Sequence, residues 1–127
     1  MSVFPFQMGK LLELPYTLAQ DYTLLELLQE STPQIWQAKV DYLRNVHGMM
    51  LLDTHSDYLL LGKNLEVYRK FLDGMAEQKD TLFHALPSEV GAWWQKRSAM
   101  TGDKLSVSAT ITRIINNTDS KTLSLVL

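Results

Sequence analysis

Apolar residues along the chain alternate between short continuous runs and helical spacing. The runs at 2–6 and 10–14, on either side of Gly9, are typical of two short strands or one broken strand. Two later runs, at 49–52 and 81–86, each predict a further strand. Because helical segments separate these later runs, the pattern predicts an α/β fold in which helices cover a mainly parallel sheet.

Four segments have the three- and four-residue spacing of amphipathic helices. Thr23 and Glu26 have capping-box spacing at the start of the first. The second begins at Pro33, the preferred first position for proline, and Gly48 suits the left-handed residue that ends it. Asn64 is expected to cap the third. The apolar faces are Leu24, Leu25, Leu27 and Leu28; Trp36, Val40, Leu43 and Val46; Leu65, Tyr68, Phe71, Leu72 and Met75; and, behind Pro87, Val90, Trp93 and Trp94.

The segment 101–127 has a different pattern. Apolar and polar residues alternate strictly from 105 to 112, which predicts a half-buried strand. Turn-forming residues at 116–120 and an apolar run at 121–127 complete a predicted β-hairpin with antiparallel pairing. The chain is therefore expected to have two parts, 1–100 and a hairpin extension at 101–127. Because it stops on an apolar strand, we expect it to be a fragment of a longer protein.

Composition narrows the possible partners. The chain has 127 residues, 46% hydrophobic and 20% charged, which is typical of a folded domain. A net charge of −2 does not favour nucleic acid or an anionic membrane as a partner. Cysteine is absent, which excludes disulfides and thiolate metal sites. Neither a membrane-spanning run nor a signal-peptide pattern is found, so we expect a cytoplasmic location.

The most informative polar cluster is Asp53, His55 and Asp57, directly after the predicted strand at 49–52. In parallel α/β folds, catalytic groups lie where strands end and loops begin. Imidazole titrates near neutrality, so His55 is the leading candidate for a proton carrier. The alternative is a loop histidine that caps a backbone carbonyl. Asp53 could orient the imidazole, or it could be a plain hydrogen-bonding residue at the strand end.

The other two histidines are expected to be structural. His47 falls in the last turn of a predicted helix, where a partly positive ring favours the helix dipole. His84 falls within a predicted strand and is expected to be packed. A metal site from all three histidines would need three separate elements to converge, and no spacing supports one. The pair Trp93-Trp94 could stack on a sugar, but packing against the sheet is the preferred interpretation.

Three ordered motifs carry a family resemblance: ELPYTLAQDYTLL at 13–25, GMMLLDTHSDY at 48–58 and HALPSEVGAWW at 84–94. Together they resemble the C-terminal part of the catalytic barrel of the polysaccharide deacetylase (carbohydrate esterase) family, in the branch linked to bacterial surface-polysaccharide biosynthesis. The similarity covers roughly 3–100. It implies a partial (β/α) barrel, TIM-barrel-like, from a hydrolase that removes N-acetyl groups from sugars with a divalent metal, zinc or similar.

The resemblance also implies site residues. His55 matches the histidine that serves as general acid and protonates the leaving amine. Asp21 resembles an aspartate that orients a charged partner beside the base, although that partner is absent from this chain. Its alternative role is a turn or a cap before a helix. Glu13 and Tyr16 are expected, by position only, to line the same cleft.

The family's Asp-Asp pair, which provides the base and one metal ligand, and its His-x-x-x-His pair of ligands are absent from this sequence. We therefore expect a fragment of a metal-dependent deacetylase that binds no metal cofactor alone and is inactive alone. Its expected partners are an N-acetylated carbohydrate substrate and a complementing barrel segment. The alternative is a non-catalytic α/β module that binds a protein partner, a glycan or a second copy of itself through exposed sheet edges.

Overall fold

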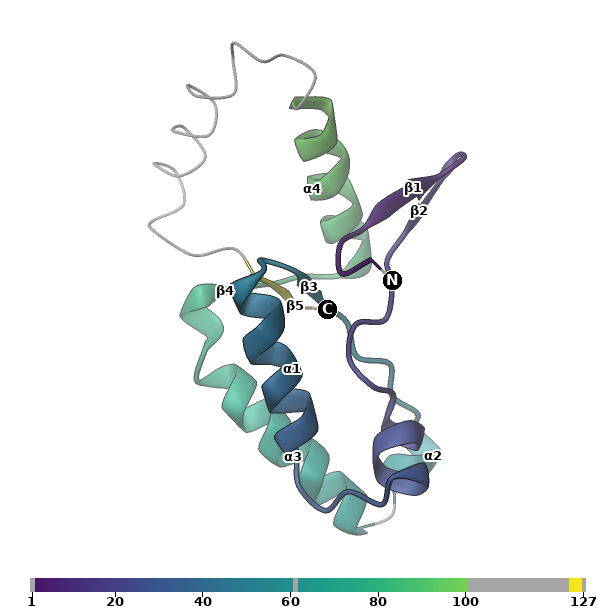
Figure 1. Ribbon diagram of the computed structural model, residues 1–127, viewed down its shortest axis with the longest axis vertical. Helices are drawn as coiled ribbons and strands as arrows, with labels where there is room; N and C mark the ends of the chain where they lie inside the picture. The colour runs from purple at the N-terminus through teal and green to yellow at the C-terminus, as the bar shows by residue number, and fades with distance from the viewer. Residues whose placement is uncertain (1, 61, 101–123, 127) are drawn as a thin grey trace.

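The computed structural model describes residues 2–60, 62–100 and 124–126, and helices and strands alternate along them (Figure 1). None of the helices in these ranges is long and apolar enough to cross a membrane. The elements are β1 (Phe6–Met8), β2 (Leu11–Glu13), η1 (Tyr22–Leu27), α1 (Gln34–Asn45), β3 (Met49–Met50), α2 (Ser56–Leu59), α3 (Gly62–Ala76), η2 (Lys79–Thr81), β4 (Leu82–His84), α4 (Pro87–Met100) and β5 (Ser124–Val126).

The first two strands form an antiparallel hairpin that projects beside α4 (Figure 1). Phe6 pairs with Glu13, and Gly9 turns the chain with a φ of 61°. This positive φ is a conformation that glycine adopts without steric cost. Of the two alternatives for the segments around Gly9, the structure has two strands, and β1 lies at Phe6–Met8 instead of the predicted 2–6.

A second sheet has the strand order β3-β5-β4, with both pairs parallel. The strands predicted at 49–52 and 81–86 are present in shortened form as β3 and β4. The first strand of the predicted C-terminal hairpin lies outside the described residues. The part that is described, β5, pairs with β3 and β4 in parallel. Three parallel strands occur in many α/β folds, so the partial barrel stays a prediction.

The main core lies where α1 packs against α3, side by side in Figure 1. Trp36 on α1 is fully buried, and its ring lies 5.1 Å from that of Phe71 and 6.4 Å from that of Tyr68 on α3. The indole Nε1–H donates to the carbonyl oxygen of Ala19 at 2.7 Å, which ties the segment before η1 to the helices. The buried apolar residues are Leu18, Leu24, Leu25, Trp36, Val40, Leu43, Met50, Val67, Phe71, Met75 and Leu82.

The C-terminal end of α1 differs from the prediction. His47, not Gly48, has the left-handed conformation, with a φ of 53°. The His47 N–H donates to the Arg44 carbonyl and the Gly48 N–H to the Leu43 carbonyl, the pair of bonds that defines a Schellman motif. Gly48 lies in a tightly packed place instead, because a Cβ there would lie 3.1 Å from the Leu43 side chain and 3.3 Å from the Val3 side chain.

The start of η1 is also capped differently from the prediction. Asp21, not Thr23, provides the cap, and its carboxylate accepts the Tyr22 N–H at 2.8 Å. The turn is wider than an α-helix, since the Leu28 N–H donates to the carbonyl of Thr23. The predicted capping box of Thr23 and Glu26 is therefore wrong.

Asn64 lies inside α3, which begins at Gly62, and does not cap it. Its buried amide donates to Glu26 Oε1 at 2.7 Å and to the Tyr58 carbonyl at 3.0 Å. Asn64 thereby joins η1, α2 and α3, a role that its place in the sequence did not indicate.

Both tryptophans of α4 are used in packing, but only Trp93 packs against the sheet as predicted. Val90 is buried, and Trp93 packs against the small cluster that Val90 forms with Met49. Trp94 stacks on Phe4, with 6.3 Å between the ring centroids. The helix therefore covers the N-terminal segment as well as the start of β3.

Candidate functional site

Two segments distant in the sequence, one before η1 and one after β3, run side by side at the candidate site. The Thr17 N–H donates to the Leu51 carbonyl at 3.2 Å, and the Thr17 hydroxyl accepts the Leu51 N–H at 2.8 Å. Further along, the Asp21 N–H donates to the Asp53 carbonyl at 3.4 Å. These bonds hold Asp21 beside the residues that follow the strand.

The central contact joins Asp21 to His55. The Asp21 side chain is completely buried, and its Oδ1 lies 2.8 Å from Nδ1 of His55. Its Oδ2 accepts the backbone N–H of His55 at 2.6 Å, and Oδ1 also accepts the Tyr22 N–H. Three hydrogen-bond donors thus satisfy the buried carboxylate, which makes its burial tolerable.

This contact determines which ring nitrogen of His55 is available for chemistry. A carboxylate accepts hydrogen bonds only, so the neutral imidazole keeps its proton on Nδ1. Nε2, on the other side of the ring, is then the nitrogen that gains and loses a proton. His55 remains 43% exposed, so a ligand can approach the ring.

The pKa of His55 is raised above its ordinary value. The hydrogen bond to Asp21 is the largest cause, and the negative charges of Asp21, Asp53 and Asp57 act in the same direction. Desolvation lowers the pKa but does not outweigh them. The ring therefore holds a proton at a higher pH than an isolated imidazole does.

Asp53 does not make the ring hydrogen bond that the sequence suggested, since Asp21 makes it. Asp53 Oδ2 lies 3.9 Å from Nε2 of His55 and accepts a hydrogen bond from Gln20 Nε2 at 2.8 Å. Sequence analysis missed Gln20. Its place directly before Asp21, in a motif already singled out, was the available signal.

Two aromatic residues were also missed, and one of them, Tyr58, contacts the imidazole, while Tyr22 contacts Tyr58. The Tyr58 ring meets His55 edge-on, with 5.5 Å between the centroids. Tyr22 lies 5.0 Å from Tyr58 and is 40% exposed. The site therefore combines a proton-carrying nitrogen with a partly exposed aromatic surface.

The remaining predicted residues are placed less closely. Glu13 lies on β2 of the hairpin, and Tyr16 is half exposed in the segment that follows. No hydrogen bond, ion pair or ring contact within the described ranges joins either residue to His55, so their role as cleft residues stays a prediction. His84 ends β4 and is exposed, so the prediction that it is packed was wrong.

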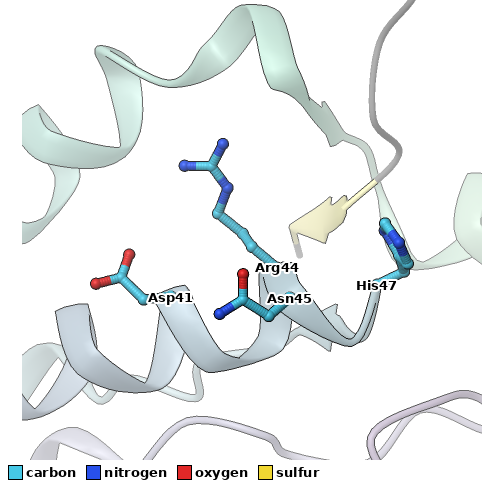
Figure 2. A pocket seen from close by; sticks show the side chains of 4 residues that line it. All are labelled: Asp41, Arg44, Asn45 and His47. Atoms are coloured by element: carbon cyan, nitrogen blue, oxygen red, sulfur yellow. The ribbon is translucent and has the colours of Figure 1, made fainter.

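A hollow of about 460 Å³ lies away from His55, at the end of α1. Its arginine is tied to Gln78 and Thr81, which connects α1 to the segment after α3. Arg44 thus holds elements together, and the candidate site stays at His55. Figure 2 shows the four residues that line the hollow, which are Asp41, Arg44, Asn45 and His47.

The family resemblance implies a divalent metal, and the described residues offer no site for one. They contain no group of three histidine, cysteine, aspartate or glutamate side chains that could hold a metal ion. Asp21 is already engaged by three donors. These residues therefore do not fit a resident metal.

Comparison with models of protein families, with curated proteins and with solved structures found no match to this chain. A function is therefore inferred from the geometry of Asp21 and His55 and from the three sequence motifs.

Proposed function

We propose that this chain provides the general-acid part of a hydrolase that removes N-acetyl groups from sugars, and that it is inactive alone. The main support is one observation: a buried carboxylate, Asp21, holds Nδ1 of an exposed histidine, His55, and leaves Nε2 open. General acid catalysis needs a side chain that brings a proton within hydrogen-bond reach of the leaving group, and Nε2 of this held, partly exposed imidazole could do so. The three motifs that resemble the polysaccharide deacetylase family supply the substrate class.

The proton transfer follows from this geometry. Hydrolysis of an N-acetyl group passes through a tetrahedral intermediate in which the carbon–nitrogen bond must break. The electron pair of that bond goes to the amine nitrogen, which takes the proton from Nε2 of protonated His55. The ring is left neutral with its other proton on Nδ1, still donating to Asp21. Tyr22, which is partly exposed, offers an aromatic ring for the apolar side of a sugar ring.

The proposal can be tested with the chain as it is. N-acetylglucosamine oligomers should shift the NMR signals of His55 and Tyr22, while an acetate-release assay with added zinc should show no turnover. His55→Gln should weaken the oligomer response, and His47→Gln, at the other end of β3, should leave it unchanged. If the oligomers move neither signal, the proposal is wrong. Turnover by the chain alone, abolished in His55→Gln, would disprove only the expected inactivity.

A second candidate function has a separate observation in its favour. Three apolar residues of the β1–β2 hairpin are exposed: Phe6 by 42%, Met8 by 56% and Leu11 by 64%. A two-stranded hairpin leaves open edges, which tend to pair with another chain. On this proposal the protein is a non-catalytic module that associates with a second copy through the hairpin.

The two candidates differ in a measurable way. Light scattering coupled to size-exclusion chromatography should show a dimer that becomes a monomer in Met8→Lys if the hairpin is the interface. A monomer at all accessible concentrations excludes self-association and leaves the hydrolase proposal standing.

A further inference from the structure

On the side of His55 that faces away from Asp21, the Asp53 carboxylate lies near Nε2 without bonding to it, and Gln20 is hydrogen-bonded to that carboxylate. Asp53 Oδ2 lies 2.8 Å from Gln20 Nε2 and 3.9 Å from Nε2 of His55. The same carboxylate oxygen is thus bonded to the amide and is about one ångström too far from the imidazole to bond it.

We propose that Gln20 is a positioning residue that holds Asp53 back from the imidazole, so that the Nε2 proton of His55 is left for the leaving group. This inference rests on the proposed role of His55 as general acid. It adds that Gln20 keeps the Nε2 proton of His55 free for transfer.

The physical reason is a balance between charge and hydrogen bonding. At 3.9 Å the Asp53 carboxylate favours the imidazolium through its charge alone. If it closed to the roughly 2.8 Å of a charge-assisted hydrogen bond, it would hold the proton that His55 must give away. The amide of Gln20 already donates a hydrogen bond to Oδ2 of Asp53, so this oxygen gains less from moving toward the imidazole.

The other groups around the ring do not take over this role. Asp21 is occupied on the Nδ1 side, and Tyr58 meets the ring edge-on from α2. Asp57, at the start of α2, contributes through its charge. Among the described residues, Asp53 is therefore the carboxylate next to Nε2, and Gln20 is the group that holds it.

The test uses the whole chain and Gln20→Met, which keeps the length of the side chain and removes the donor. Imidazole nitrogen signals followed by NMR over pH report the pKa of His55 and the state of each ring nitrogen. We expect Gln20→Met to raise the pKa of His55 and to slow solvent exchange of the Nε2 proton. An unchanged or lowered pKa overturns the inference. Gln7→Met, on the β1–β2 hairpin, is the matched control.

Asp53→Asn tests the same geometry from the other partner. It should lower the pKa of His55, and in that background Gln20→Met should have no further effect. A purely structural role for Gln20 predicts the same shift with or without Asp53, which is the opposite result. If Gln20→Met fails to fold, Asp53→Asn decides alone, because an unmoved His55 titration then overturns the inference.

The outcome is separable from that of the proposed function. If the pKa of His55 shifts as expected in the variants but N-acetylglucosamine oligomers do not perturb the protein, the positioning role of Gln20 is supported and the hydrolase proposal is rejected. If the oligomers bind but the pKa of His55 is unchanged in both Gln20→Met and Asp53→Asn, the hydrolase proposal is supported and the positioning role is rejected.

Discussion

Two histidines flank the same short strand, β3, and the structure uses them in different ways. His47 acts through its backbone, which adopts a φ of 53° and closes the end of α1. His55 acts through its side chain, because the buried carboxylate of Asp21, 34 positions away, holds its ring. The comparison teaches that a partner from a distant segment, and not the position beside a strand, makes one histidine a candidate acid.

Removal of that partner should have the largest effect. Asp21→Ala leaves the backbone N–H groups of Tyr22 and His55 without their acceptor, so we expect a loss of about 3 kcal/mol in unfolding free energy. Urea denaturation measures this loss. Asp57→Ala, an exposed residue of α2, is the control, and an equal loss in both variants would mean that the buried contact does not stabilise the fold.

Trp36→Phe tests how Asp21 is held in place. The change keeps an aromatic ring but removes the hydrogen bond to Ala19 and part of the core volume, so we expect a loss of about 2 kcal/mol. Amide hydrogen exchange should also become faster between 17 and 21. Trp93→Phe on α4 is the control. Unchanged exchange in that segment would show that Trp36 does not support the site.

His47→Gly should increase the unfolding free energy, whereas the two preceding substitutions should decrease it. Glycine adopts a positive φ without steric cost, whereas other residues are strained there, so we expect a gain of roughly 0.5–1 kcal/mol. Gln29→Gly, at a φ of 54°, is a matched variant and should also stabilise. Thermal unfolding measures both. A loss in His47→Gly would mean that the His47 side chain itself stabilises the turn.

The contribution of His55 to stability should be recognisable from the direction in which it changes with pH. Its pKa is raised in the folded protein, so the folded state binds the proton more tightly than the unfolded state. The added stability is fully present below the pKa of the unfolded imidazole and is lost as the pH rises through the folded pKa. The unfolding free energy of the wild type should therefore exceed that of His55→Gln by more at low pH than at high pH. When both proteins also carry Asp21→Asn, the stability difference between them should depend less on pH. An equal pH dependence would exclude Asp21 as the cause of the raised pKa.

The local pattern predicts those features that depend on neighbouring residues in the sequence. The spacing of Trp36, Val40 and Leu43 identifies the buried face of α1, and Gly9 marks the hairpin turn. His55 stands out because a polar cluster follows an apolar run. Each of these signals arises from residues close together in the chain.

The pattern does not predict contacts that only the folded chain creates. Asp21 reads as a cap, and it is one, but its bond to His55 depends on two segments lying side by side. Gly48 reads as the left-handed residue, yet packing against Val3 gives it a different role. Asn64 reads as a helix start because its partners on η1 and α2 cannot be seen locally.

The most direct measurement is the NMR titration of the His55 ring in the unmodified protein. A pKa above that of an ordinary imidazole, with the neutral ring protonated on Nδ1, is the result expected if Asp21 holds the ring. A pKa at or below the ordinary value, with the neutral ring protonated on Nε2, would show that Asp21 does not make His55 a proton carrier.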